Sequence, residues 1–254
     1  MSDTGNPAVS LPLPRADWAY FFDIDGTLVD FAPRPGGVKL DAELRDLIER
    51  LYRTAGNAVA LISGRSIPDV DQLFPHARLP VAGQHGTERR AARGRVSQHA
   101  FPMAGLGVAR ARLTEAAARH PGLWLEDKGL SLALHYRGAP ALAADAHRLM
   151  DHVLAEAGPV FCLLTGKGIV ELRPAGRDKG VAVQEFMQEE PFRGRVPAFV
   201  GDDVTDEHGF KMVNRMGGHS VKVGPGETDA RWRLRDVRAV RTWLARGLAE
   251  EESA

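Results

Sequence analysis

Short apolar runs that end at turn residues alternate along this chain with helical patterns, and this alternation constrains the fold more than any other feature. Residues 20–24 (YFFDI) and 57–63 (NAVALIS) are such runs, and their length favours buried strands. Between them, residues 40–55 place leucines on one helical face, with Asp41 as a candidate N-cap. Strands that alternate with helices predict a parallel sheet with helices on both faces. The sequence therefore predicts an α/β core that is doubly wound.

A different pattern interrupts this alternation in the middle of the chain. Residues 88–98 predict a polar hairpin, while residues 106–120 and 139–158 predict helices that are each followed by two strands. This order predicts a small antiparallel α+β cap domain inserted into the Rossmann-like core. From Asp178 the first pattern resumes, and a closing helix is expected from Thr228. The expected division is core 1–104, cap 105–174 and core 175–254.

Composition excludes several kinds of protein. The chain has 254 residues, of which 44% are hydrophobic and 26% charged, as in an ordinary globular protein. Lys plus Arg and Asp plus Glu both number 33, so no overall field recruits nucleic acid or anionic lipid. The one cysteine, Cys162, forms neither an internal disulfide nor a zinc cluster. Because no apolar run reaches the roughly 18 residues of a spanning helix and residues 1–17 lack a signal-peptide pattern, we expect a cytoplasmic protein.

Two carboxylates, Asp23 and Asp25, stand where the first predicted strand ends. Alternate strand residues face the same side, and parallel sheets bind ligands beyond the carboxyl ends of their strands. Gly26 allows an immediate turn, so both side chains are expected to enter one crevice. Carboxylates so close together need a compensating cation, and oxygen ligands suit Mg²⁺. An exposed turn with an Asx cap is the alternative interpretation of this motif taken alone.

The stretch DIDGTLVD (23–30) resembles the first motif of the haloacid dehalogenase-like (HAD) phosphatases, and the other three motifs of that superfamily follow in order. The second is Ser63, which ends the apolar stretch ALIS, and the third is Lys179 in RDKG. The fourth is an acidic group after an apolar strand, comprising Asp202, Asp203 and Asp206. Each motif falls at the end of a predicted element, so the resemblance covers most of the chain.

The resemblance implies a division of catalytic labour. Asp23 would attack phosphorus and become an aspartyl phosphate, which splits one difficult step into two. Asp25 would protonate the leaving sugar oxygen and then take a proton from water. Ser63 and Lys179 would hold the phosphoryl oxygens.

The same resemblance implies a Mg²⁺ site at the strand ends. The expected ligands are Asp23, the backbone carbonyl of Asp25, and Asp202. Asp203 and Asp206 share the two remaining roles, which are to reach the metal through water and to orient Lys179. The sequence leaves open which residue takes which role.

Within the superfamily, the chain is similar to the trehalose-6-phosphate phosphatases. The matching stretches are ISGR (62–65), QHGTE (84–88), EDKGLSLALHYR (126–137), GKGIVELRP (166–174) and GDDVTDEHGF (201–210). That family hydrolyses trehalose 6-phosphate to trehalose and phosphate, the last step of trehalose biosynthesis. Its pattern commonly has Asn before His-Gly, where this chain has Gln84, so a substrate contact by Gln84 stays open.

Charged side chains in the cap hairpins are expected to bind sugar hydroxyls, because charged partners make the stronger hydrogen bonds. The expected substrate-binding residues are Arg65, Gln84, His85, Gly86, Glu126, Lys128, Lys167 and Glu171. For Arg65, a structural salt bridge is the alternative to a bridge to the substrate. We expect a small-molecule sugar phosphate as the partner, with no nucleic acid or membrane, and a monomer.

Two alternative functions share much of this pattern. A phosphatase for another sugar phosphate, of the sucrose phosphate or mannosylglycerate phosphate type, would share all four motifs and differ only in its cap. A catalytically silent sensor that binds the sugar phosphate would lack a nucleophile, a metal ligand or the lysine, and this chain has all of them.

Overall fold

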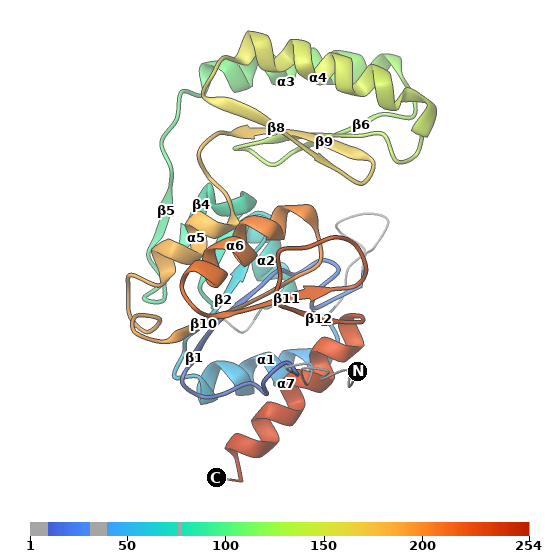
Figure 1. The fold of residues 1–254 in the computed structure, drawn as a ribbon. Coiled ribbons are helices and arrows are strands. Elements are labelled where there is room, and N and C mark those ends of the chain that lie inside the picture. Colours follow the sequence, from blue (N-terminus) through green and yellow to red (C-terminus); the bar gives the residue numbers. More distant parts are fainter. Residues whose placement is uncertain (1–9, 31–39, 76–77, 254) are drawn as a thin grey trace, which may run out of the picture.

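The computed structural model describes residues 10–30, 40–75 and 78–253, and Figure 1 shows a core below and a cap above. The core is built on one sheet with the strand order β12-β11-β10-β1-β2-β3-β4-β5. All pairs from β12 to β3 are parallel, and β4 and β5 are antiparallel additions at one edge. Its strands are β1 (Trp18–Phe22), β2 (Val59–Ile62), β3 (Val81–Gly83), β4 (Glu88–Arg90), β5 (Val96–Gln98), β10 (Val196–Gly201), β11 (His219–Val223) and β12 (Trp232–Leu234).

Helices cover both faces of this sheet, which confirms the doubly wound core. One face packs against α1 (Ala42–Thr54), α2 (Ile67–Leu73) and α7 (Val237–Glu251), and the other against α5 (Lys179–Phe186) and α6 (Glu207–Arg215). Leu44, Leu47 and Leu51 are buried in α1 as expected, whereas Leu40 lies before the helix and is half-buried. Asp41 caps that helix by accepting from Leu44 N. Helices cover both faces of the sheet, so successive residues of a strand are buried on one face or the other. This explains why the strand segments are apolar throughout and do not alternate with polar residues.

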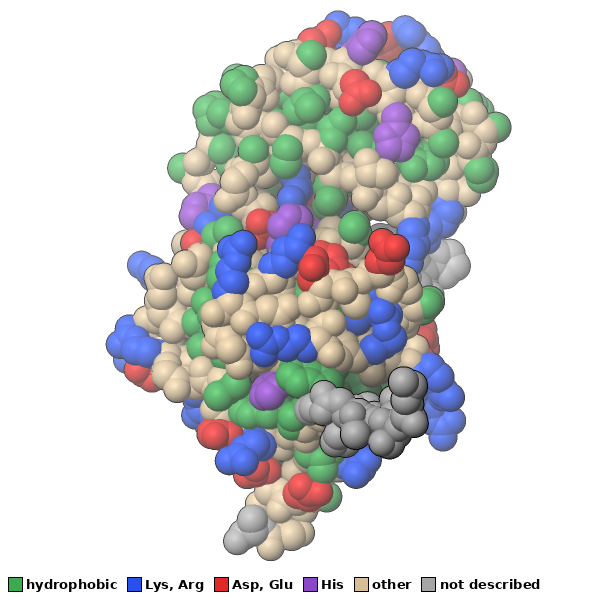
Figure 2. Space-filling view, in the orientation of Figure 1, with side chains coloured by type: hydrophobic (Ala, Val, Ile, Leu, Met, Phe, Trp, Pro, Cys, Tyr) green, Lys and Arg blue, Asp and Glu red, His purple; other side chains and the backbone are tan. Residues whose placement is uncertain are grey.

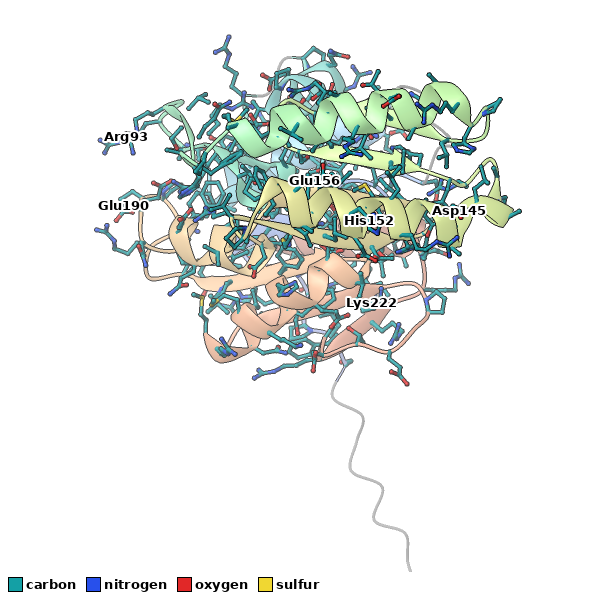
Figure 3. All side chains as sticks on the ribbon, turned by 90° about the horizontal axis from the view of Figure 1, so that it is seen from above. Arg93, Asp145, His152, Glu156, Glu190 and Lys222 are labelled. Atoms are coloured by element: carbon teal, nitrogen blue, oxygen red, sulfur yellow. The ribbon has the colours of Figure 1, made fainter. Side chains whose placement is uncertain are left out.

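The cap is a smaller α+β domain with two layers, a sheet and a pair of helices. Its four-stranded antiparallel sheet has the order β6-β7-β9-β8, and a single apolar cluster joins one face of this sheet to α3 and α4. Figure 3 shows these two helices side by side across the top of the molecule. The cap elements are α3 (Ala104–Arg119), β6 (Trp124–Asp127), β7 (Leu132–His135), α4 (Ala143–Ala157), β8 (Phe161–Gly166) and β9 (Ile169–Pro174). The other face of the sheet is turned toward the core (Figure 1).

Two details differ from the sequence-based expectation. The closing helix does not begin near Thr228, because Trp232–Leu234 forms β12 and pairs with β11. Helix α7 begins only after Asp236, whose side chain accepts from Ala239 N as its N-cap. The helix expected from residue 139 begins as a 3₁₀ turn at Pro140–Leu142, and α4 starts at Ala143. The 88–98 hairpin is confirmed and extends the edge of the core sheet.

Among the described residues, no helix is both long and apolar enough to cross a membrane. The signal-peptide prediction concerned residues 1–17, of which 1–9 lie outside the described part of the chain.

Candidate active site

Three neighbouring strands of the core sheet end beside one another and deliver the polar motifs to one place. β1 lies between β10 and β2, and the residues that follow these strands are Asp23, Asp202 and Ser63. Gly26 has φ +85°, a conformation that glycine adopts without strain, and it turns the chain directly after Asp25. Parallel order therefore brings together side chains that are far apart in sequence.

Lys179, the first residue of α5, joins the acidic group. Its ammonium donates to Asp23 Oδ1 at 2.8 Å and to Asp206 Oδ1 at 2.7 Å, and all three side chains are buried. Burial alone would lower the pKa of Lys179, but the carboxylates of Asp206 and Asp23 outweigh it and hold that pKa above the ordinary value. The lysine is therefore a fixed positive charge next to Asp23.

The structure separates the two acidic residues whose roles the sequence left open. The second oxygen of Asp206, Oδ2, accepts from the backbone N–H groups of Asp202 (3.0 Å) and Asp203 (2.9 Å), so both of its oxygens are engaged. A Cβ atom at Gly201 would lie 2.3 Å from Asp206 Cγ, which explains the glycine there. Asp203, by contrast, lines the cavity between core and cap. The geometry therefore suits Asp206 to orienting Lys179 and leaves Asp203 facing the cavity.

The acidic group also fits a divalent cation. Asp23, Asp202 and Asp206 each offer a carboxylate oxygen within 4.8 Å of the others. Burial raises the pKa of Asp23, Lys179 lowers it, and the neighbouring carboxylates raise it further, so it lies above its ordinary value. Burial and the carboxylates of Asp206 and Asp203 raise the pKa of Asp202 to about 6. Because Asp206 is already engaged, Asp23 and Asp202 are the carboxylates best placed to bind a cation that relieves this repulsion.

Asp25 is held from the side by Arg65. The guanidinium makes a bidentate pair, with Nε 2.6 Å from Oδ2 and Nη2 2.7 Å from Oδ1. The backbone N–H of Arg65 also donates to the hydroxyl of Ser63 at 3.1 Å. The salt bridge that the sequence offered as one alternative for Arg65 is thus present. Arg65 also lines the cavity, so its side chain lies within reach of a bound substrate.

A cavity of about 220 Å³ lies between these strand ends and the cap sheet. In the space-filling view, basic, acidic and histidine side chains gather along the seam between core and cap (Figure 2). Ser63, Arg65, His85 and Lys179 line the cavity from the core side. Its lining from the cap includes Glu126, Lys128, His135, Leu164, Ile169 and Glu171.

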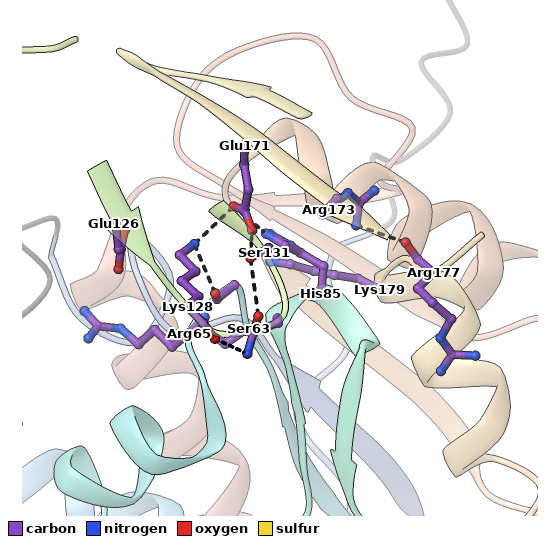
Figure 4. Close-up of polar contacts among 12 residues, drawn as sticks. Ser63, Arg65, His85, Glu126, Lys128, Ser131, Glu171, Arg173, Arg177 and Lys179 are labelled. Carbon is purple, nitrogen blue, oxygen red and sulfur yellow. Dashed lines mark hydrogen bonds and ion pairs between the residues drawn. The ribbon is translucent and has the colours of Figure 1, made fainter. Parts of the chain in front are cut away.

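Lys128 and Glu171 form the centre of the cap side (Figure 4). Lys128 Nζ lies 3.0 Å from Glu171 Oε2 and donates to the carbonyl of Gly64 in the core at 3.4 Å. Glu171 also accepts from Ser131 Oγ at 2.6 Å, and His85 Nε2 lies 3.7 Å from it. Burial lowers the pKa of His85, while Glu171 raises it, and the net direction is downward. A neutral imidazole next to a carboxylate suits hydrogen bonding.

Gln84 connects core and cap instead of lining the cavity. Its Nε2 donates to the backbone carbonyl of Lys128 at 2.8 Å, and its Oε1 accepts from Ser131 Oγ at 3.3 Å. Gln84 and His85 both have positive φ, +45° and +56°, which is uncommon for residues other than glycine. Two successive such residues mark a strained loop that the surrounding contacts hold in place.

Two other expected substrate-binding residues also lie outside the described cavity lining. Lys167 is exposed in the turn between β8 and β9, where its backbone carbonyl accepts from Arg137. The carbonyl of Gly86 accepts from Arg177 Nε at 3.0 Å. Their substrate contacts stay predictions.

Sequence reasoning missed Ser131 and His135. Ser131 bonds both Gln84 and Glu171, and His135 Nε2 lies 2.9 Å from Glu126 Oε2. The sequence did carry a signal for them. Ser131 and His135 stand four residues apart in SLALHYR, and because alternate strand residues share a face, both lie on the same face of that strand. Strand pairing, which placed that face opposite Glu126, was needed to use it.

Comparison with known proteins identifies the family of this chain. The sequence model of the trehalose-phosphatase family matches residues 21–238. The chain is 43% identical to trehalose-6-phosphate phosphatase of Escherichia coli (strain K12) over 238 residues, which span 94% of this chain and 89% of the relative. It is 44% identical over 209 residues to the probable trehalose-phosphate phosphatase of Sinorhizobium fredii (strain NBRC 101917 / NGR234), covering 82% of this chain and 78% of that one.

Solved structures share the fold. The C-terminal domain of Candida albicans trehalose-6-phosphate phosphatase matches with a TM-score of 0.81 over 91% of each chain, at 22% identity. A trehalose-6-phosphate phosphatase related protein matches with a TM-score of 0.78 at 26% identity, over 92% of this chain and 99% of that one. The family match spans both the core motifs and the cap, and the chain therefore belongs to the trehalose-phosphatase family.

Proposed function

We propose that this protein is a Mg²⁺-dependent phosphatase that hydrolyses trehalose 6-phosphate to trehalose and phosphate. The observation that carries the proposal is the convergence of Asp23, Ser63 and Lys179 on one cavity, with the polar face of the cap opposite them. Membership of the trehalose-phosphatase family supports the choice of substrate.

In the first step, Asp23 is the nucleophile. Lys179 binds its Oδ1, which leaves the other carboxylate oxygen to form a bond to phosphorus while the bond from phosphorus to the sugar oxygen breaks. Asp25 gives its proton to the departing sugar oxygen. Because both oxygens of the Asp25 carboxyl are engaged by Arg65 in this arrangement, we infer that Arg65 turns toward the phosphoryl oxygens when substrate enters.

In the second step, water attacks the phosphorus of the aspartyl phosphate and Asp25 takes its proton, so Asp23 and free phosphate are restored. Ser63 and Lys179 hold the phosphoryl oxygens through both steps. Asp206 keeps the Lys179 ammonium directed at them.

Asp23, the Asp25 carbonyl and Asp202 would hold Mg²⁺, which supplies positive charge next to the phosphoryl group when it is bound. Asp203 would reach that ion through water. The raised pKa of Asp202, about 6, supports this assignment, because a cation there offsets the repulsion among the buried carboxylates.

The cap supplies the sugar contacts. Glu126, Lys128 and Glu171 line the cavity and offer charged hydrogen-bond partners for hydroxyl groups. His85 also lines the cavity, and its Nε2 lies 3.7 Å from Glu171. The cytoplasmic location and the monomeric state expected from the sequence stay predictions.

The test is phosphate release from trehalose 6-phosphate, sucrose 6-phosphate, mannosylglycerate phosphate and glucose 6-phosphate, with Mg²⁺ and with a chelator. We expect trehalose 6-phosphate to have the highest kcat/KM and turnover to stop on chelation. Asp23→Asn should remain folded and lose about a thousandfold or more in kcat. Asp17→Asn, a control at an exposed residue, should keep the native kcat.

Each outcome has a meaning. A higher kcat/KM for another sugar phosphate overturns the assigned substrate and keeps the phosphatase. Binding of trehalose 6-phosphate without turnover by the native chain indicates a silent sensor. Near-native turnover by Asp23→Asn removes Asp23 as the nucleophile.

A further inference from the structure

The cap is joined to the core by two short stretches of chain. Residues 99–103, the first connection, lead from β5 into α3, and residues 175–178, the second connection, lead from β9 into α5. Most residues of the first connection are exposed, as are Ala175 and Gly176 in the second. Arg177, which follows them, is only half-buried as a residue, yet its side chain is bonded to the core.

Arg177 ties the second connection to two parts of the core. Its Nε donates to the carbonyl of Gly86 at 3.0 Å, and its Nη1 and Nη2 make a bidentate pair with Glu185 of α5, at 2.7 and 2.8 Å. The side chain of Arg177 is 11% exposed. Arg173 of the cap strand β9 donates to the backbone carbonyl of Arg177 at 2.9 Å (Figure 4). One guanidinium therefore fixes the end of this connection against both α5 and the loop of Gly86.

The first connection meets the same loop and the same carboxylate. The backbone N–H of His99 donates to the carbonyl of Thr87 at 2.9 Å, and the ring Nε2 of His99 lies 3.8 Å from Glu185 Oε1. Consecutive carbonyls, those of Gly86 and Thr87, thus bind the two connections. Gly86 also packs against the start of α5, since a Cβ atom there would lie 3.2 Å from the carbonyl oxygen of Asp178.

This loop carries two residues of the active site at its other end. The N–H groups of Gln84 and His85 donate to the carbonyls of Arg65 and Ser63, each at 2.9 Å. Gln84 contacts the cap hairpin, and His85 lines the cavity. Both have positive φ, a conformation that persists only when surrounding contacts hold it. Arg177 supplies one of the contacts that hold the loop.

We propose that Arg177 is a positioning residue for the active site. Paired with Glu185, it holds the Gly86 carbonyl, and this contact keeps the side chains of Gln84 and His85 in place for the sugar phosphate. Arg177 acts through the loop, and its own side chain is not among the described residues that line the cavity. The inference rests on the proposed function, because it assigns a further residue to that site.

The chemistry at phosphorus should depend little on this contact. Asp23 and Asp206 hold the Lys179 ammonium directly, and α5 keeps its own N-cap, Asp178. Loss of the Arg177 guanidinium should therefore weaken the binding of a substrate that reaches the loop. It should spare the turnover of a small phosphate ester that reaches only the phosphate-binding residues.

The test is a double-mutant cycle on Arg177 and Glu185, with trehalose 6-phosphate and p-nitrophenyl phosphate as substrates. Arg177→Met keeps an unbranched side chain and removes the guanidinium. We expect it to raise KM for trehalose 6-phosphate by about 10-fold, as for the loss of one hydrogen bond from a charged donor, and to change kcat much less. Both constants for p-nitrophenyl phosphate should be unchanged. Glu185→Ala should raise KM less, and the double variant should match Arg177→Met, because both changes remove one clamp.

Arg193→Met is the matched control. Arg193 Nε donates to the carbonyl of Gln188 at 3.0 Å and its Nη1 lies 3.8 Å from Glu190 Oε1, so it makes contacts of the same kind within residues 188–193. Its side chain is 64% exposed, and the variant should keep native constants. Arg177→Lys keeps the charge without the planar fork, so its KM should lie between those of the native protein and Arg177→Met.

The outcomes separate this inference from the proposed function. If the native protein does not hydrolyse trehalose 6-phosphate, the proposed function fails. If it does, a native KM in Arg177→Met, an equal loss on both substrates, or additive losses in the double variant refutes the role of Arg177 while the proposed function stands. Native melting temperatures exclude misfolding, and if Arg177→Met melts lower, Arg177→Lys and Glu185→Ala decide by the same criteria.

Discussion

Replacement of Gln84 by alanine tests whether this core residue holds the cap over the active site. Gln84 makes two hydrogen bonds to the cap hairpin, at 2.8 Å to the Lys128 carbonyl and at 3.3 Å to Ser131 Oγ. A hydrogen bond contributes a net of about 0.5–1.5 kcal/mol, so the arrangement with the cap hairpin against the core should lose about 1–3 kcal/mol relative to one in which they separate. That corresponds to roughly 5–150-fold in the equilibrium between these two arrangements.

In Gln84→Ala, substrate binding has to bring the cap hairpin back against the core. We therefore expect KM to rise by roughly 5–150-fold. The kcat value should fall less, because Lys128 and Glu171 still bind the saturating substrate. The assay is the KM and kcat of phosphate release, together with hydrogen exchange of the amides of residues 126–135 without substrate. Faster exchange of these amides is expected.

Gln98→Ala provides the matched control, since Gln98 is exposed on the edge strand β5. Gln84→Asn, which shortens the amide by one methylene, should fall between Gln84→Ala and the native protein. The reasoning is refuted if Gln84→Ala shows native KM and native exchange in the cap hairpin.

Two further perturbations follow from the buried charges. Asp206→Ala removes one partner of the buried Lys179 ammonium, so the free energy of unfolding, measured by heat or denaturant, should fall by about 3–5 kcal/mol. Asp203→Ala should lower it much less. Equal losses in the two variants would contradict the role given to Asp206. For Glu171, burial would raise the pKa, but Lys128, His85 and Ser131 lower it below the ordinary 4.5. Because the folded pKa is depressed, this carboxylate stabilises the fold above about pH 4.5, and the contribution is lost as pH falls toward the folded pKa. The melting temperature of the native protein should therefore fall more steeply than that of Glu171→Gln between about pH 5 and pH 3, and parallel curves would contradict this.

The amino-acid sequence determined the architecture of the core and the identity of its polar strand ends. Apolar runs, helical faces and the N-cap at Asp41 are local features, and they predicted the doubly wound sheet. Because parallel strands end at one edge, Asp23, Ser63 and Asp202 could be assigned to one site before any contact was known. The expected start of the final helix at Thr228 was wrong, because pairing of β12 with β11 depends on partners distant in sequence.

Only the tertiary structure decided what each polar side chain touches. Asp203 and Asp206 are equivalent in a sequence pattern, yet packing against Gly201 directs Asp206 to Lys179. Lys179 and Asp23 are 156 residues apart, and Gln84 reaches a carbonyl 44 residues away in the cap. Local spacing fixes on which strand end and which strand face a residue lies, because strand geometry repeats every two residues. Contacts between elements depend on sheet order, register and cap position, which arise only when the whole chain packs.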